Sequence, residues 1–209
     1  MNRVLFLFLD GVGLGADDPA TNPFARARMP NLKEMLDGHR LLADLPAFST
    51  ERVSFVPTDA CLSVAGMPQS ASGQAAILTG INVPRRIGKH WGPKPNAEIK
   101  TLLQEDNLFK RLRNQGCSVR LANAYPPVFL QRIESGRRAL SAIQLAVEAA
   151  GVNLCTEADL RDGRAFAADF TGEAWRSQLD FEDTPVLSPD EAGRGLVHAA
   201  HEHRVLFFD

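Results

Sequence analysis

The sequence has no excess of charge of either sign and no long apolar segment. Its 209 residues include 23 basic and 25 acidic side chains, which give a formal net charge of -2. No positive field is therefore available to attract nucleic acid or an anionic membrane surface. No segment approaches the roughly 20 consecutive apolar residues that span a bilayer. We expect a protein that binds neither nucleic acid nor membranes and that holds any phosphate group through local contacts.

Cysteine is also scarce. Cys61, Cys117 and Cys155 are odd in number and show no Cys-x-x-Cys spacing, which argues against a disulfide framework and against a cysteine zinc site. The apolar run at residues 4–9 is too short for a signal peptide and lacks a small-residue cleavage pattern. These absences favour a cytoplasmic protein.

The apolar content of 44% is enough for one substantial α/β core, alone or with a smaller inserted domain. The run at residues 4–9 shows no alternation and ends at Asp10-Gly11, a pattern typical of a central parallel strand that is covered on both faces. Residues 204–208 form a second run of this kind. Because open α/β sheets bind ligands at the carboxyl ends of their strands, Asp10 stands where chemistry is expected.

The spacing of apolar and capping residues predicts several further elements. We expect a strand over residues 117–122 and a linker over 84–95, with short strands of unplaced bounds between 41 and 66. Helices are predicted over residues 31–36 (with Asn31 as cap), 70–79, 97–115, 139–150 and 189–203.

Asp10 has two interpretations from its sequence context alone. A carboxylate at the end of a buried strand is costly unless it is paired or binds a cation. Aspartate in a turn, however, also commonly accepts hydrogen bonds from backbone N–H groups. Both interpretations stay open at this point.

Ser70 also has two interpretations. It opens a predicted helix, where the helix dipole and unsatisfied N–H groups favour an anion or an alkoxide. With no adjacent His or Lys, the hydroxyl would need a metal ion to become a good nucleophile. The alternative is a plain helix cap, a role for which Ser72 competes.

The glycines that follow the first run raise a competing hypothesis. Gly11-x-Gly13-x-Gly15 resembles a dinucleotide-binding turn, although the spacing differs from Gly-x-Gly-x-x-Gly and Pro19 and Pro23 would break the helix that should follow. A nucleotide-binding α/β protein is therefore the weakest of the alternatives.

Two segments together resemble the alkaline phosphatase superfamily: residues 8–13 (Phe-Leu-Asp-Gly-Val-Gly) and residues 68–80 (Pro-Gln-Ser-Ala-Ser-Gly-Gln-Ala-Ala-Ile-Leu-Thr-Gly). The likeness is to the branch of cofactor-independent phosphoglycerate mutases, phosphopentomutases and related metalloenzymes. The resemblance implies a three-layer α/β/α sandwich with a mostly parallel central sheet and an inserted small α/β cap. It implies residues 1–92 as the first part of the core, residues 93–185 as the cap and residues 186–209 as the return to the core.

The resemblance also implies a chemistry. Asp10 and Ser70 would bind metal, Ser70 would be the nucleophile, and two divalent cations of the zinc or manganese type would serve transfer through a phosphoserine. The substrate would be a small phosphorylated metabolite. Gln74 occupies a position where mutases often have His and sulfatases Arg, so the resemblance does not fix the substrate or the exact reaction.

The segment at residues 87–95 (Ile-Gly-Lys-His-Trp-Gly-Pro-Lys-Pro) resembles a junction into the cap of this branch. His90 and Lys94 would then contact substrate phosphate, whereas the alternative is a solvated loop anchored by Trp91. The pair Arg137-Arg138 carries the same two interpretations. His198 and His201 share a helix face, but we expect a solvated helix end there.

The remaining metal ligands of the family follow the strand that matches residues 204–208. The resemblance thus implies that these 209 residues hold metal poorly and turn over little or no substrate. Besides metal-dependent phosphoryl transfer, a catalytically silent binding or structural domain is therefore a second hypothesis.

Overall fold

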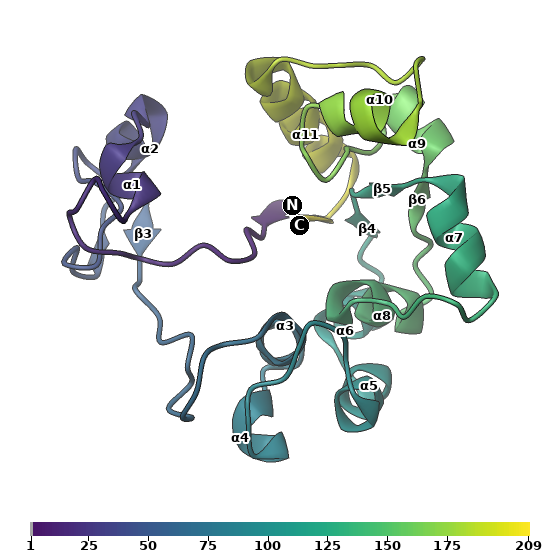
Figure 1. The fold of residues 1–209 in the computed structure, drawn as a ribbon, viewed down its shortest axis with the longest axis horizontal. Helices are drawn as coiled ribbons and strands as arrows, with labels where there is room; N and C mark the ends of the chain where they lie inside the picture. The colour runs from purple at the N-terminus through teal and green to yellow at the C-terminus, as the bar shows by residue number, and fades with distance from the viewer. Residues whose placement is uncertain (1) are drawn as a thin grey trace. The chain divides into compact units, whose positions relative to one another are not determined.

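The computed structural model describes residues 2–209, which divide into two compact units (Figure 1). One unit combines the first ten positions with Cys61–Asp209, and the other is Gly11–Ala60. Each unit is described by itself below. The larger unit holds all of the sequence-predicted site residues.

The sheet of the larger unit has three parallel strands in the order β1-β7-β4. These strands are β1 (Val4–Leu7), β7 (Val205–Phe208) and β4 (Val119–Leu121). Leu206 of β7 lies opposite Leu5 on one side and Arg120 on the other. The prediction of a mixed α/β protein with a parallel sheet is confirmed in this form, and the second apolar run is the central strand.

The predicted central position of the first run is wrong. β1 lies at the edge of this sheet, where its two inner side chains are half-buried and its two outer ones, Val4 and Leu7, are 49% and 50% exposed. A continuous apolar run indicates that a strand has apolar surface to cover, but it does not specify how many strands flank it. Asp10 is accordingly an exposed residue.

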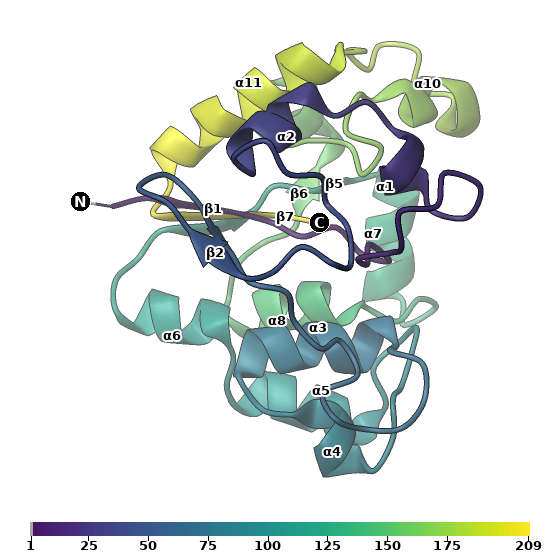
Figure 2. The ribbon, with the colours of Figure 1, turned by 90° about the vertical axis from the view of Figure 1, so that its left-hand side faces the viewer.

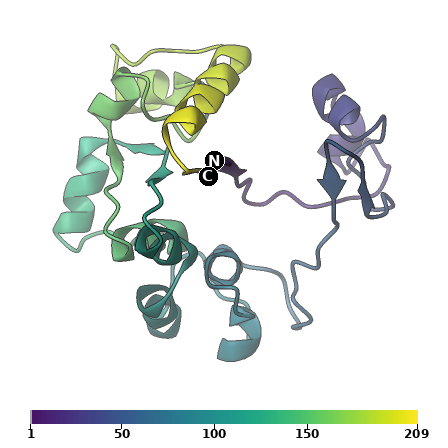
Figure 3. The ribbon, with the colours of Figure 1, turned by 180° about the vertical axis from the view of Figure 1, so that it is seen from behind.

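Helices cover both faces of the sheet (Figure 2). Val205 and Phe207 point into the main core, where Phe207 stacks on Phe6 with ring centroids 4.6 Å apart. Leu206 and Phe208 point the other way, into a second core with the helix α11 (Pro189–Glu202). A capping box between Ser188 and Glu191 begins α11, which leads directly into β7 (Figure 3).

The main core is built on α3 (Ser70–Thr79), which follows the predicted bounds and ends at Gly80 in the left-handed conformation (φ 74°). Four helices pack around it: α4, α5, α6 and α8. The predicted linker contains a helix, because Asn82 caps a turn that Pro84 can join without losing a hydrogen bond. These surrounding helices are α4 (Val83–Ile87), α5 (Ala97–Glu105), α6 (Leu108–Asn114) and α8 (Ala142–Ala149).

The single helix predicted over residues 97–115 is wrong, since it is broken between α5 and α6. Asn107 is fully buried there, accepts a hydrogen bond from the Lys110 N–H (3.1 Å) and donates one to the Leu103 carbonyl (2.8 Å). Its side chain therefore begins a new helix inside an apparently continuous apolar pattern.

A third core with Trp175 and Leu160 joins the remaining elements of the larger unit. The predicted division into a core and an inserted region at residues 93–185 stays a prediction. These elements are β5 (Ala124–Tyr125), β6 (Cys155–Thr156), α7 (Pro127–Glu134), α9 (Glu157–Arg161) and α10 (Glu173–Leu179).

The smaller unit contains two short helices and one antiparallel strand pair: α1 (Pro23–Arg26), α2 (Pro30–Met35), β2 (Phe48–Ser49) and β3 (Ser54–Phe55). The helix α2 starts one residue before the predicted cap Asn31, because Pro30 is well suited to the first turn. Among residues 2–209, no helix combines the length and the apolar character that crossing a membrane requires.

Candidate functional site

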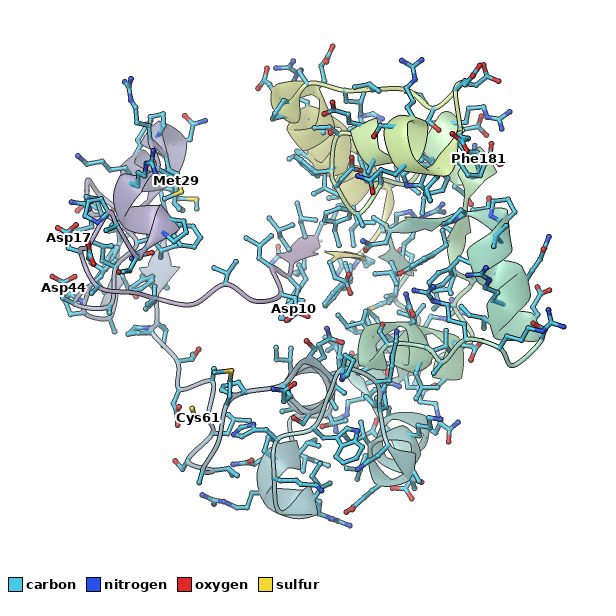
Figure 4. The ribbon with its side chains drawn as sticks, in the orientation of Figure 1. Asp10, Asp17, Met29, Asp44, Cys61 and Phe181 are labelled. Atoms are coloured by element: carbon cyan, nitrogen blue, oxygen red, sulfur yellow. The ribbon has the colours of Figure 1, made fainter. Side chains whose placement is uncertain are left out.

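Asp10 and Ser70, sixty residues apart in the sequence, are in direct contact. The Ser70 hydroxyl Oγ donates a hydrogen bond of 2.8 Å to Asp10 Oδ2, and the Gln74 amide Nε2 lies 3.3 Å from the same oxygen. Asp10 stands just beyond β1 with its side chain toward α3 (Figure 4). Two of the sequence-predicted site residues, Ser70 and Gln74, therefore contact the same carboxylate oxygen of a third, Asp10.

Ser70 is the first residue of α3 and does not act as its cap. The cap position is Gln69, which makes no side-chain capping bond, and the Ser70 hydroxyl is turned to Asp10. Ser72 is buried and bonds to the loop that follows α4, through its N–H to the Trp91 carbonyl (2.9 Å) and through its Oγ from the Trp91 N–H (3.0 Å). The two serines thus have different roles, and the positive end of the helix dipole lies beside Ser70.

Gly92 lets this loop lie against the first turn of α3. A Cβ atom placed on Gly92 would come within 3.0 Å of Gln69 Cβ and 3.3 Å of the Ser70 nitrogen. Nearby, the Trp91 indole Nε1 donates to the Lys94 carbonyl (2.9 Å), which shapes the loop so that Lys94 reaches the site.

A cavity of about 500 Å³ opens beside Asp10, Ser70, Gln74 and Lys94. His90 does not line it. Its Nε2 lies 3.1 Å from the Val64 carbonyl oxygen, and its ring lines a separate hollow beside Gly66. The structure therefore brings four of the five predicted residues together and leaves His90 apart.

Asp209 lines the same cavity and was given no role by the sequence interpretation. Its backbone is tied to the buried Asn123, since its N–H donates to Asn123 Oδ1 (3.0 Å) and its carbonyl accepts from Asn123 Nδ2. Burial raises the pKa of the Asp209 carboxyl, and the charge of Asp10 raises it further, against an opposing effect of Lys94. The signal available in the sequence was its position after an apolar run, the same signal that selected Asp10.

Lys94 lines the same cavity as these carboxylates, and its charge acts on Asp209. Burial lowers its pKa, the charge of Arg138 lowers it further, and the charge of Asp209 raises it. A partly buried ammonium group beside two carboxylates can attract an anion into a site that the carboxylates alone would repel.

Three aromatic side chains also line the cavity, and the sequence interpretation missed them. Tyr125 of β5 and Phe129 of α7 are stacked with ring centroids 4.8 Å apart, and Trp175 of α10 lines the cavity beside them. Burial raises the pKa of the Tyr125 hydroxyl, which therefore stays protonated, although a hydrogen bond from Gln144 acts in the opposite direction.

The chain matches no family model, no curated protein and no solved structure. The site is therefore interpreted from its own geometry.

The geometry argues against the nucleotide-binding hypothesis at the glycine-rich turn. A dinucleotide turn needs a helix whose N-terminus receives the phosphates directly after the glycines. Here residues 16–22 follow Gly15 without a helix, and the next helix is the four-residue α1, which begins at Pro23.

The donor atoms fit one divalent cation better than two. Asp10, Asp209 and Ser70 offer two carboxylates and a hydroxyl, oxygen ligands that suit manganese or magnesium more than zinc. Asp10 and Asp209 line the same cavity, and the charge of Asp10 raises the pKa of Asp209, an unfavourable interaction that a cation would offset. Within residues 2–209 there is no cluster of three or more His, Cys, Asp or Glu side chains that could hold a metal ion. Both predicted cations stay predictions.

Proposed function

We propose that this protein is a phosphoryl-transfer enzyme of the alkaline phosphatase type in which Ser70 is the nucleophile. The observation that carries the proposal is the 2.8 Å hydrogen bond from Ser70 Oγ to Asp10 Oδ2 at the start of α3. A hydroxyl that donates to a carboxylate has a lone pair turned away from that carboxylate and a partner able to take its proton. Because a carboxylate is a weak base, the hydroxyl also needs a cation beside it to become a good nucleophile.

In the proposed reaction, a bond forms between Ser70 Oγ and the phosphorus atom of a small phosphorylated metabolite. The bond from phosphorus to the leaving alcohol breaks, and the alcohol oxygen takes up the proton that Ser70 has lost. Asp10 orients the hydroxyl and accepts its proton, while Lys94 and the N-terminus of α3 favour the anionic phosphoryl group. Attack by water or by a second hydroxyl then releases phosphate or a phosphorylated product.

Asp10, Asp209 and Ser70 would hold the divalent cation. Such an ion supplies a lower pKa for the serine hydroxyl and neutralises charge on the phosphoryl oxygens. The chain's own contribution is to hold Ser70 Oγ against Asp10 and to position Gln74 on the same oxygen.

We also propose a layer architecture, an inserted cap and a cellular location. Helices on both faces of a parallel sheet support a three-layer α/β/α core, with residues 93–185 as an inserted cap. We place the protein in the cytoplasm, where a buried thiol such as Cys155, whose pKa burial raises, stays reduced.

A binding protein without turnover is the second candidate. The observation that favours it is the small number of metal-ligating side chains around Asp10 in the part of the chain that the structure describes.

The test is covalent labelling of the purified protein. The protein is incubated with manganese or zinc and 4-nitrophenyl phosphate, and its intact mass is measured by mass spectrometry at short times. We expect a species heavier by one phosphoryl group in the wild type and in Ser177→Ala, whose exposed hydroxyl bonds only within α10. We expect none in Ser70→Ala. Labelling that persists in Ser70→Ala would remove Ser70 as nucleophile, and no labelling in any variant would favour the binding protein.

A further inference from the structure

The cavity beside Ser70 is lined by residues of different chemistry. One group of lining residues carries the reactive groups, Asp10, Ser70 and Asp209, and the lining also includes three aromatic side chains, Tyr125, Phe129 and Trp175, which we call the aromatic wall. A volume of about 500 Å³ is far larger than a phosphoryl group needs and lies within the range of sites for small organic ligands. The site therefore has room for the rest of a substrate.

The aromatic wall is rigid. Tyr125 and Trp175 are only 9% and 4% exposed, and Trp175 also packs on Phe181 with ring centroids 5.2 Å apart. Phe129 is held from two sides, by Tyr125 and by the Arg138 guanidinium, whose central carbon lies 4.4 Å from the ring centroid. Because these rings are fixed before binding, a ligand does not have to order them.

Rings of this kind select for another ring. Aromatic groups attract one another both when stacked and when the edge of one meets the face of the other, so Tyr125 and Phe129 can receive a flat group without losing their own contact. A phosphorylated acid or polyol without a ring would leave the exposed part of the Phe129 ring in contact with water.

Polar groups are interleaved with the rings. Gln144 is buried, its Oε1 accepts from the Ser141 N–H (2.8 Å), and its side chain hydrogen-bonds the Tyr125 hydroxyl. Gln178 adds an exposed amide from α10. Amide and hydroxyl groups beside aromatic rings can bond the ring nitrogen and oxygen atoms of a heterocycle, which a plain hydrocarbon ring does not offer.

We propose that this site takes a phosphate monoester whose alcohol carries a flat heterocyclic ring, of about the size of a nucleoside monophosphate. The aromatic wall of Tyr125, Phe129 and Trp175 is the specificity-determining part. The proposal depends on the proposed function only for which end of the ligand carries the phosphate, because recognition of the ring is a separate contact.

The experiment compares two probes that differ only by the heterocyclic base. Adenosine 5′-monophosphate and ribose 5-phosphate share the sugar and the phosphate, and their binding to the wild-type protein with added manganese is measured by calorimetry. We expect the nucleotide to bind at least about tenfold more tightly, which is at the lower end of the effect of stacking one base on aromatic side chains. Equal affinities would overturn the proposal.

Two variants locate the effect. Phe129→Leu keeps an apolar side chain and should lose about fivefold in affinity for the nucleotide, with ribose 5-phosphate within about twofold of wild type. Phe170→Leu is the matched control, because Phe170 is also partly buried and packs on a ring, that of Phe208, but lines a different hollow. A nucleotide preference that survives unchanged in Phe129→Leu would also overturn the proposal.

Fluorescence provides a readout that does not depend on catalysis. The chain has two tryptophans, and Trp91 lines the separate hollow beside His90. In the wild type we expect adenosine 5′-monophosphate to change the emission more than ribose 5-phosphate does, and this difference should disappear in Trp175→Phe, in which only Trp91 still emits. Running the same titration on Ser70→Ala separates the two proposals. A retained ring preference without any serine labelling would remove the proposed reaction alone, and serine labelling without a ring preference would remove the ring proposal alone.

Discussion

The strands β1 and β7 have almost the same composition but different surroundings. Both are four residues of Val, Leu and Phe, they pair in parallel, and an aspartate follows each of them closely in the chain. All four side chains of β7 are at most 8% exposed, whereas Val4 and Leu7 of β1 are half exposed. The comparison shows that an apolar run defines a strand, while its neighbours decide how much stability it contributes.

The largest expected difference between the two strands is in stability. Leu206→Ala removes a fully buried side chain and should lower the free energy of unfolding by about 2–5 kcal/mol. Leu7→Ala acts at a half-exposed position and should cost less than about 1 kcal/mol. Urea unfolding followed by circular dichroism measures both. Equal losses would mean that β1 is as well covered in solution as β7.

The strand on the other side of β7 offers the next test, because β4 is tied to α9 by an ion pair. The Arg120 guanidinium donates to Asp159 Oδ1 (2.9 Å), and the Thr156 N–H and hydroxyl donate to Oδ2 (2.9 and 3.0 Å). Burial would raise the pKa of Asp159, but these hydrogen bonds outweigh it and lower the pKa to about 2.

We expect Asp159→Asn to lose about 1–2 kcal/mol at pH 7. The folded pKa of Asp159 is below the unfolded value of 3.8, so its contribution is present above that value and disappears as the pH falls toward 2. The free energies of unfolding of wild type and variant should therefore become equal as the pH is lowered through this range. Asp190→Asn, an exposed pair on α11, is the control and should change stability by less than about 0.5 kcal/mol.

The aspartates that follow β1 and β7 should act together on a cation. Manganese at ten times its dissociation constant should stabilise the wild type by about 1.4 kcal/mol in a thermal unfolding experiment. Asp10→Asn and Asp209→Asn should each lose most of this gain, because each removes one of the two carboxylates, whereas Asp190→Asn should keep it. A gain that persists in either variant would place the cation elsewhere.

The smallest expected effect is that of Asp209 without metal. Burial and the charge of Asp10 raise the folded pKa of Asp209, so its contribution to stability is complete below the unfolded pKa of 3.8 and is lost as the pH rises through the folded pKa. Asp209→Asn should therefore gain up to about 1 kcal/mol at neutral pH and nothing in acid. A loss at pH 7 would show that the carboxylate has a stabilising partner.

The sequence was sufficient where a feature depends on a few neighbouring residues. The start and end of α3, the capping box of α11 and the strand β7 follow from local spacing and capping. The contact of Asp10 with Ser70 was predictable as well. In open α/β sheets, residues at the carboxyl ends of strands and at the starts of the following helices lie along the same edge of the sheet.

The sequence was insufficient where distant segments decide the outcome. The edge position of β1 depends on which strands pair with it, and the break at Asn107 depends on a side chain that satisfies two backbone groups at once. The aromatic wall joins Tyr125 and Trp175, fifty residues apart, without any shared pattern between them. Asp209 followed the same rule as Asp10, but its role needed the position of Asn123.

Gly92 shows how closely the reactive oxygen depends on its surroundings. The space that a single methyl group would need there is already filled by the first turn of α3. Adding that group would press on the backbone that carries Ser70 and so on the alignment of its hydroxyl with Asp10. The position of the Ser70 hydroxyl therefore depends on the absence of a side chain at Gly92, twenty-two residues further along the chain.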